Sequence, residues 1–377
     1  MLDVDREQVL AYRIAAQGLH RGERDPAGLT VFDLGLQSTQ RDTAAISLAA
    51  RLPGPIAEDS FAGDPRFVLA WTHRGAPHFH RAPEIDQVTA ALVPLGEDDA
   101  MARMGWQRKQ VESAGMSATD ALFTAAKAIR KVVTRTMTKG AVSTAVTKII
   151  PAGLSYWCRG CQATHILEQL MRLATIHGGV RLEAGAQPAT LTPLAGRPRM
   201  RTTPDPGAAT AVVRDYLRLH GPATAKEAAD FVGTKVSTVR QMWPDDLAEV
   251  RVSGRPAYLP ATEVAALESP PEPDLVRLLP PWDPFLQSRD RAVLVPDRAR
   301  QKEVWKILGN PGALLAGGEV AGVWRTKGSG RKRLDFTITA FDPLPPAARK
   351  AAETEAETVA ATRGFADLRI SWGEVVS

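Results

Sequence analysis

Residues 34–43 (LGLQSTQRDT) bring amide, hydroxyl and carboxylate side chains together behind an apolar lead-in. A glutamine carbonyl oxygen can hold and orient a water molecule, with less charge stabilisation than a carboxylate gives. On a helix, Gln37 and Gln40 would share a face, whereas Gln37 and Thr39 would not. Alternatively, Asp42 or Thr39 caps the following helix by accepting its first amide hydrogens. The segment therefore predicts either a water-positioning site or a capped helix start.

Three histidines, His73, His78 and His80, lie close together in the stretch WTHRGAPHFH. Alternate residues of a strand point to the same side, so His78 and His80 would share a face and offer two metal-ligating groups. No neighbouring acid or cysteine completes such a site. We interpret the stretch as a hairpin with Arg74 at its tip, which either faces a polyanion or is a solvated turn.

A second group of possible metal ligands is Cys158-x2-Cys161-x3-His165. We predict a helix over residues 158–176. On it these side chains would fall on one face, which permits zinc binding, but a closed zinc site needs four ligands. His177 is the one loose candidate for the fourth, and the sequence has no second C-x2-C. The alternative is that the two thiols pack in a hydrophobic core, and we predict no metal here.

The charge distribution indicates an anionic partner. The net charge is +5 and the isoelectric point about 9.3, but no acidic residue occurs between Asp120 and Glu168. A long stretch without a carboxylate creates a local positive field that suits nucleic acid; a solvated helix face is the alternative. Two cysteines in 377 residues argue against a disulfide framework. The acidic N-terminus is no signal peptide and no apolar run reaches about 18 residues, so we predict a cytoplasmic protein.

The elements that must position these residues repeat along the chain as helices followed by a β-hairpin. The first two copies have predicted helices at 5–20 and, opened by a polar cap, at 117–135. The clearest copy has helices at 208–221 and 225–233, with the capping box Thr224–Glu227 between them, and a hairpin at 248–260. Helices followed by a two-stranded wing are typical of winged-helix domains, with any three-helix domain plus hairpin as the alternative. We predict an α+β fold of three tandem winged-helix domains and a C-terminal β-barrel-like domain. The predicted boundaries are 1–116, 117–195, 196–268 and 269–377.

Two proline-rich linkers, 196–207 and 268–274, separate the last two regions from what precedes them. After the second linker comes LLPPWDPFLQSRDR (278–291), where Asp283 could cap a turn and pair with Arg289. A glycine-tipped hairpin at 319–341, a helix at 345–365 and a closing strand at 366–372 complete the predicted domain, either a small mixed β-barrel or a sheet with one packed helix.

The segments LGLQSTQ (34–40), LLPPWDPFLQSRDR (278–291) and GVWRTKGSG (322–330) resemble motifs of the winged-helix DNA glycosylases typified by AlkZ and YcaQ. The resemblance covers nearly the whole chain. It implies a protein that holds duplex DNA in a basic channel and hydrolyses the N-glycosidic bond of an alkylated purine, including bulky adducts or crosslinks. It also implies that no metal and no cofactor takes part.

In that family the catalytic motif is Gln-x-Gln or Gln-x-Asp. Gln37 matches its first position, Thr39 stands at the second, and Gln40 comes one residue late. Alkylation makes the purine a cationic leaving group, so a residue that places water beneath the sugar carbon could suffice. The sequence therefore makes Gln37 the candidate catalytic residue, with Thr39 or Gln40 as its partner.

Two interpretations of the whole chain follow: a monomeric DNA glycosylase, or a non-catalytic winged-helix protein that keeps only the DNA clamp. A transcriptional regulator would need a ligand pocket or dimerisation element, and no convincing heptad seam is visible. The candidate DNA-binding residues are Arg41, Arg74, His78, Arg130, Lys131, Arg135, Lys139, Lys148, Arg289, Lys327, Arg331 and Lys332.

Overall fold

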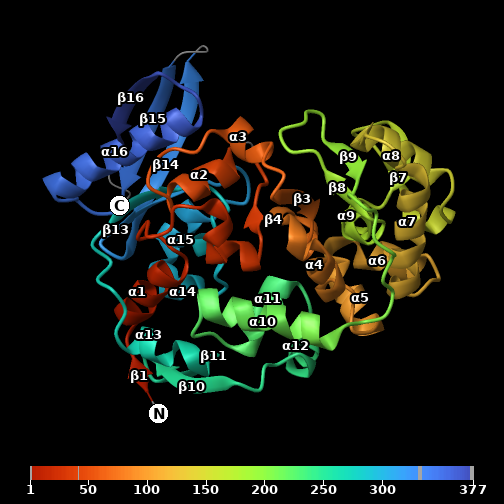
Figure 1. Cartoon of the computed structure of the whole chain (residues 1–377), viewed down its shortest axis with the longest axis horizontal. Coiled ribbons are helices and arrows are strands. Elements are labelled where there is room, and N and C mark those ends of the chain that lie inside the picture. The colour runs from red at the N-terminus through yellow and green to blue at the C-terminus, as the bar shows by residue number, and fades with distance from the viewer. Residues whose placement is uncertain (1, 41, 330–332, 374–377) are drawn as a thin grey trace. The chain divides into compact units, whose positions relative to one another are not determined.

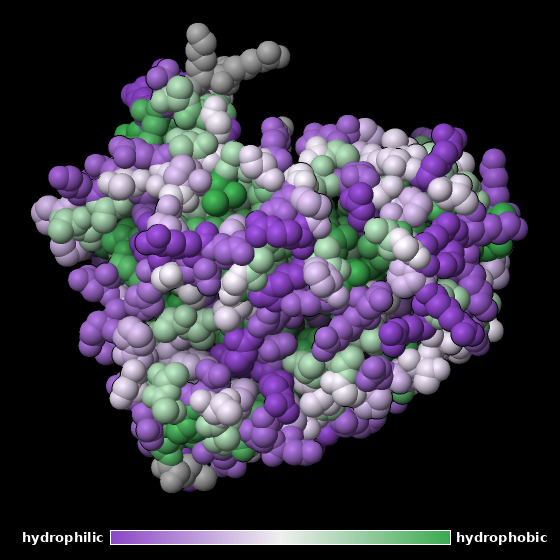
Figure 2. All heavy atoms as spheres, viewed as in Figure 1, coloured by the Kyte–Doolittle hydropathy of each residue, from purple (hydrophilic) through white to green (hydrophobic). Residues whose placement is uncertain are grey.

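A computed structural model describes residues 2–40, 42–329 and 333–373. The chain divides into two compact units (Figure 1). The first unit comprises Met1–Asp64, Tyr216–Glu227 and Asp246–Ser377, and the second comprises Pro65–Asp215 and Ala228–Asp245. Hydrophilic side chains are spread over the visible faces of both units (Figure 2). No helix among the described residues is long and apolar enough to cross a membrane.

The first unit begins with helix α1 (Arg6–Ala16), which Asp5 caps by accepting a hydrogen bond from Gln8 N at 2.8 Å. Its apolar face buries Val9, Leu10 and Ile14, as the helical spacing predicts. The elements that follow in this part are strand β2 (Leu36–Gln37), helix α2 (Thr43–Ala49) and helix α3 (Glu58–Ala62).

A three-stranded sheet packs on α1. Strands β10 (Leu247–Val252) and β11 (Arg255–Pro260) form an antiparallel hairpin, and β1 (Asp3–Val4) pairs parallel to β10. Helix α13 (Val264–Glu268) closes a core that contains Val9, Tyr12, Val250 and Leu259. The predicted hairpin at 248–260 is confirmed.

The C-terminal strands form an open sheet, not the predicted β-barrel-like closure. Its order is β12-β13-β14-β15-β16, and only the β15–β16 pair is parallel. Helix α16 lies along one face of this sheet (Figure 1). There Ala352, Ala356 and Val359 pack against Trp324 and Phe336. Since one long helix already buries that face, the described strands need no closure to form a core. The bounds are β12 (Val276–Leu279), α14 (Arg291–Leu294), α15 (Arg298–Val304), β13 (Gly312–Ala316), β14 (Glu319–Ser329), β15 (Arg333–Ala340), α16 (Pro346–Thr362) and β16 (Asp367–Trp372).

The second unit is built on strands in the order β4-β3-β8-β9-β5. The β3–β4 hairpin forms where the sequence predicts it, and Ser117 caps α7 by accepting from Asp120 N at 3.0 Å. The strands are β3 (Phe67–Trp71), β4 (Pro77–Arg81), β5 (Met137–Thr138), β8 (Val180–Leu182) and β9 (Thr190–Pro193). The helices are α4 (Ile85–Ala91), α5 (Glu97–Arg103), α6 (Arg108–Ser113), α7 (Ala118–Val132), α8 (Lys139–Thr147), α9 (Glu168–His177) and α12 (Val236–Gln241).

The helix predicted over residues 158–176 is wrong in its first half. Residues Ser155–Cys158 and Ala163–Ile166 form a separate hairpin, β6–β7, and α9 begins only at Glu168. Gln162 takes a left-handed φ of 50° in the connecting turn, which a helix does not allow. Aromatic and β-branched residues before and after the turn favour strands.

Helices α10 (Pro206–His220) and α11 (Ala225–Val232) match the predicted segments. The Thr224–Glu227 capping box forms, since Glu227 Oε2 accepts from Thr224 N at 2.6 Å. The three winged-helix domains and their boundaries stay a prediction.

Candidate functional site

Gln37 lies in β2, a two-residue strand of the first unit between a 3-10 turn (Thr30–Asp33) and helix α2. Gly35 precedes it with a φ of 84°, a backbone conformation that glycine adopts without strain. Leu36 is fully buried, and the Gln37 side chain is only 6% exposed. The sequence therefore places a polar amide inside the protein, next to an apolar anchor.

The Gln37 amide is half satisfied. Its Nε2 donates to Thr39 Oγ1 at 2.7 Å. Its carbonyl oxygen Oε1 is buried and has no hydrogen-bond partner within the described chain. Leaving a buried acceptor unpaired costs about 1–3 kcal/mol, so such a group calls for a specific explanation. The hydrogen bond from Nε2 to Thr39 fixes the orientation of the amide. The unpaired Oε1 is therefore placed to accept a hydrogen bond from water or substrate.

Thr39 and Gln40 differ in their relation to Gln37. Both are exposed, but only Thr39 contacts the Gln37 amide. The bond recorded for Gln40 is a backbone one, in which its carbonyl accepts from Thr43 N at 3.3 Å. The structure therefore brings Thr39, not Gln40, to the candidate catalytic residue.

The helix-capping alternative is wrong. Asp42 is the N-cap residue of α2, but its side chain makes no capping hydrogen bond and its φ is 67°. Its carboxylate lies 3.4 Å from Arg363 Nε, at the end of α16. Arg363 could not be identified from the sequence, because no local pattern links it to Asp42, which is distant in sequence.

Asp283 of the LLPPWDPFLQSRDR motif has a structural role. It caps the turn Pro284–Gln287 by accepting from Phe285 N at 2.9 Å, as predicted. Its ionic partner is Arg51 at 2.8 Å through both oxygens, not the predicted Arg289. Both side chains of the pair are fully buried. This bidentate pair fixes the motif to the end of α2.

Asp290 of the same motif binds Arg13 of α1 at 2.6 and 3.0 Å. Arg13 is fully buried and also donates to the carbonyl oxygens of Gly221 and Pro222. Asp283 and Asp290 thus tie the motif to the end of α2 and to α1, the helices that follow and precede Gln37 in the sequence. Arg13 and Arg51 were missed from the sequence, although each is a charge placed among apolar helix positions.

The histidines of the second unit are buried, contrary to a solvated or outward-facing hairpin. His73, His78 and His80 are at most 3% exposed, and Thr72 Oγ1 lies 2.9 Å from His78 Nδ1 and 3.1 Å from His80 Nε2. Burial, reinforced by neighbouring positive groups, lowers the pKa of all three, that of His80 to about 3. They are therefore neutral core groups, and His78 is not positioned to contact DNA.

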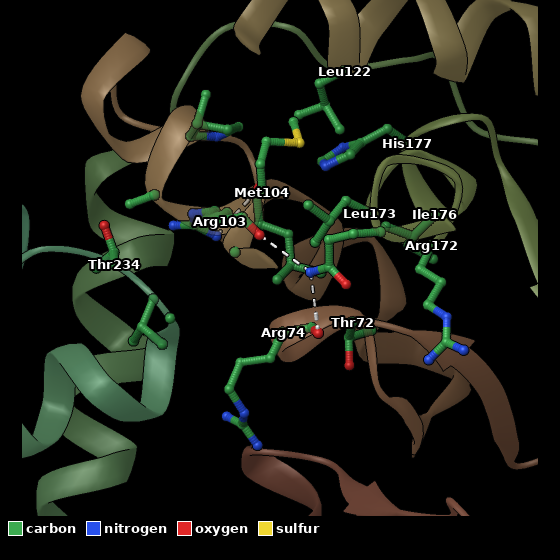
Figure 3. A pocket seen from close by; sticks show the side chains of 18 of the residues that line it. Thr72, Arg74, Arg103, Met104, Leu122, Arg172, Leu173, Ile176, His177 and Thr234 are labelled. Atoms are coloured by element: carbon green, nitrogen blue, oxygen red, sulfur yellow. Dashed lines mark hydrogen bonds between the residues drawn. The ribbon is translucent and has the colours of Figure 1, made fainter. Parts of the chain in front are cut away.

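Arg74 lines a pocket of about 640 Å³ in the second unit (Figure 3). Its guanidinium lies over the Phe231 ring at 4.8 Å and donates to the Phe231 carbonyl. Gln169 Nε2 donates to the carbonyl oxygens of Arg74 and Arg103 at 3.3 and 3.1 Å, as the dashed lines show. Arg103 pairs with Asp99, and Arg172 pairs with Glu168. Because these cations already have partners, the pocket offers little charge to an anion. No motif in the sequence marks this pocket.

The remaining basic candidates fall into three groups. Lys131, Arg135, Lys148 and Lys327 are exposed and available to a phosphate backbone. Other cations are engaged: Lys139 pairs with Glu168 at 2.6 Å, Arg130 donates to the carbonyls of Arg197 and Pro198, and half-buried Arg289 reaches Gln287 Oε1 at 3.4 Å. Arg41, Arg331 and Lys332 lie outside the described residues.

Cys158, Cys161 and His165 come together at the β6–β7 hairpin, with their ligand atoms within 4.8 Å of one another. The Cys161 backbone N–H and the neighbouring His165 ring lower the pKa of the Cys158 thiol to about 7. His177, the loose fourth candidate, is buried in α9 against Phe123 and is not part of this cluster. Cys158 is half-buried and Cys161 is exposed, so the prediction that the two thiols pack in a core is wrong.

Comparison with known proteins identifies a family and a solved structure with a similar fold. A family model described as "DNA glycosylase AlkZ-like" matches residues 33–362, which include the Gln37 segment and the LLPPWDPFLQSRDR motif. Among solved structures, the chain is similar to the Streptomyces sahachiroi DNA glycosylase AlkZ, with a TM-score of 0.75. The two sequences are 20% identical over 99% of this chain and 100% of that chain, so the likeness shows the fold alone. No curated protein sequence matches this one.

Proposed function

Because the chain belongs to the AlkZ-like family of DNA glycosylases, we propose that it hydrolyses the N-glycosidic bond of an alkylated purine in duplex DNA. The observation that carries this proposal is the buried, unpartnered Oε1 of Gln37. A fold that leaves an amide oxygen unpaired sacrifices stability, and functional sites are where such groups occur.

In the proposed mechanism Gln37 positions the water. Alkylation at a ring nitrogen gives the purine a positive charge, so the base leaves without strong acid catalysis. Gln37 Oε1 accepts a hydrogen bond from the attacking water and holds it beneath the sugar carbon. The partial negative charge of the same oxygen stabilises the oxocarbenium-like centre, more weakly than a carboxylate would.

Thr39 is proposed as a positioning residue. Its hydroxyl oxygen accepts the Gln37 Nε2 hydrogen at 2.7 Å, and this contact turns the carbonyl oxygen away from Thr39. A glutamine or aspartate at this position would offer a second acceptor for water; threonine supplies a shorter one. We therefore assign Thr39 to orienting the amide and Gln37 to the chemistry.

DNA binding is proposed to rest on exposed cations and on winged-helix units. In the second unit, β5 pairs with β9 and β9 with β8, and α8 and α9 follow β5 along the chain. This order supports a winged helix with the β6–β7 hairpin inserted before its last helix. Lys131, Arg135 and Lys148 are exposed on or next to α7 and α8, where they suit phosphate contacts.

One observation favours the second candidate, a non-catalytic DNA-binding protein. Thr39 replaces the second amide or carboxylate of the family motif, and no acidic side chain takes its place at Gln37 within the described residues. Such a protein would keep salt-sensitive duplex binding and lose base release.

Base release from a defined lesion separates the two candidates. Duplex DNA with a single N7-methylguanine, or with a bulkier N7 adduct, is incubated with the protein, and abasic sites are scored by strand cleavage. The glycosylase proposal expects release above the spontaneous rate. Duplex binding without release on either lesion would instead identify the non-catalytic protein.

A further inference from the structure

We propose that the β6–β7 hairpin of the second unit binds one zinc ion through Cys158 Sγ, Cys161 Sγ and His165 Nε2, with water as the fourth ligand. This site has no part in the proposed base hydrolysis, and it stands or falls independently of that function.

The hairpin geometry brings the three ligands to one point. Cys158 ends β6 opposite Ala163, and His165 lies across from Tyr156 in the four-pair ladder. The left-handed φ of Gln162 turns the chain so that Cys161 faces Cys158. The ligand atoms lie within 4.8 Å of one another. Zinc–sulfur bonds of about 2.3 Å and zinc–nitrogen bonds of about 2.0 Å put tetrahedral ligands roughly 3.5–3.8 Å apart, so a small contraction closes the site.

The hydrogen bond of His165 fixes the tautomer that zinc needs. His165 Nδ1 lies 3.1 Å from the Ile166 carbonyl oxygen. A carbonyl oxygen only accepts, so Nδ1 carries the proton and Nε2 keeps its lone pair for a metal. A backbone carbonyl on the second ring nitrogen is the usual support of a metal-bound histidine.

The turn between the two cysteines passes close to the first sulfur. An added Cβ at Gly160 would lie 4.0 Å from Cys158 Sγ. A short C-x2-C turn of this kind places both thiols where they can share one metal ion.

The fourth position is left to water. Glu168 is the nearest acid along the chain after His165, but Lys139 and Arg172 already hold its carboxylate at 2.6 and 2.7 Å. The group of possible metal ligands found among the described residues has three members. Since Cys161 is exposed, solvent can complete the tetrahedron.

The hairpin also needs a stabilising link that its own packing does not supply. It is a separate two-stranded sheet, and Trp157, Ala163 and Thr164 are exposed. Two short strands alone are marginally stable in water. Its base is anchored, because Ile166 N donates to Thr147 Oγ1 at 2.8 Å and Leu167 N donates to the Leu154 carbonyl at 2.9 Å. A metal ion would anchor the opposite end.

Cobalt substitution tests the proposal on the full chain. The protein is reduced, stripped with a chelator and titrated with Co²⁺. Because the sequence has only two cysteines, a thiolate-to-cobalt charge-transfer band can come from no other place in the chain. We expect that band together with tetrahedral ligand-field bands, saturation at one equivalent, and displacement by one equivalent of Zn²⁺. Absence of the charge-transfer band in the wild-type protein would overturn the proposal.

Single variants identify the ligands. Cys161→Ser and His165→Ala are expected to weaken zinc affinity beyond the roughly 10–100-fold that losing an outer hydrogen-bond partner costs. His20→Ala is the matched control, since His20 is an exposed histidine of the first unit. Unchanged affinity in both ligand variants, or equal loss in the control, contradicts the assignment. Amide exchange over 155–166 gives a second readout: zinc should slow it in the wild-type protein, and no slowing would count against the site.

Discussion

Among single residues, Gln37 carries the proposed chemistry, because the fold leaves one of its amide atoms without a hydrogen bond. Gln37 is buried, its nitrogen is bound to Thr39, and its oxygen has no partner in the described structure. The sequence was sufficient to select Gln37 from its motif. It was not sufficient to separate Thr39 from Gln40, because spacing on an ideal helix favours Gln40 and the segment is not helical.

Removing the Thr39 hydroxyl should reduce base release without reducing DNA binding. In Thr39→Val the Gln37 amide loses its fixed orientation, and we expect the single-turnover rate to fall about five- to tenfold, the equivalent of one hydrogen bond of about 1 kcal/mol. Thr39→Ser retains the hydroxyl and should stay within about twofold of wild type. Equal rates in both variants would show that the contact has no role.

Breaking the buried Asp283–Arg51 pair should destabilise the protein strongly. Asp283→Ala leaves the Arg51 guanidinium buried and uncompensated, which costs about 3–5 kcal/mol in the free energy of unfolding. Urea unfolding measures this. The exposed pair Arg108–Glu112 gives the control, because Glu112→Gln should hardly shift the midpoint. A similar midpoint shift for both would refute the structural role of Asp283.

At the element scale, local signals predicted the helices and hairpins with clear caps and turns. Ser117 begins α7, the Thr224–Glu227 box begins α11, and the Arg74–Pro77 turn joins β3 to β4. The helix predicted over residues 158–176 is wrong in its first half, because the apolar periodicity of α9 was extended backwards over the turn of the β6–β7 hairpin. The burial of His78 and His80 was also missed, since alternation gives a common face but not which face is inside.

Acid should weaken the second unit through its buried histidines. The pKa of His80 is about 3 because burial, and then Arg81, disfavour its charged form. Its contribution to stability is therefore fully present above about pH 6.5. It is lost as the pH falls toward 3, because the unfolded histidine takes up a proton and the folded one does not. We expect a loss of about 2–3 kcal/mol from His80 alone by pH 4.5.

Urea unfolding at pH 7 and pH 4.5 checks this. The pH dependence should become clearly shallower in His80→Gln and change much less in His20→Gln, because His20 is an exposed histidine of the first unit whose pKa partial burial lowers only modestly. A wild-type slope in His80→Gln would contradict the assignment.

At the scale of the whole molecule, composition and motif were sufficient for the family and for a mixed α+β fold. They were not sufficient for the C-terminal sheet, which is open where a barrel-like domain was predicted. They also could not pair Arg51 with Asp283, which lie 232 positions apart in the sequence. Such pairs depend on which segments the tertiary fold brings together, and no local pattern encodes that.

DNA affinity should lose part of its salt dependence when the exposed cations are removed. Each lost phosphate contact reduces the slope of log K against log salt by about 0.9, so the triple variant Lys131→Gln, Arg135→Gln, Lys148→Gln should lose about 2–3 in slope. Arg298→Gln, an exposed cation of the first unit, is the control and should keep the wild-type slope. An unchanged slope in the triple variant would exclude this surface as the DNA-binding one.

The proposed role of Gln37 is tested most directly by the single-turnover rate of base release in Gln37→Ala compared with Gln40→Ala. The substrate is duplex DNA bearing one alkylated purine, and duplex affinity is measured in parallel. We expect a fall of roughly 100-fold or more in Gln37→Ala, because the attacking water loses its acceptor. We expect near-wild-type release in Gln40→Ala and unchanged DNA affinity in both. Release by Gln37→Ala at the wild-type rate would contradict the proposed role.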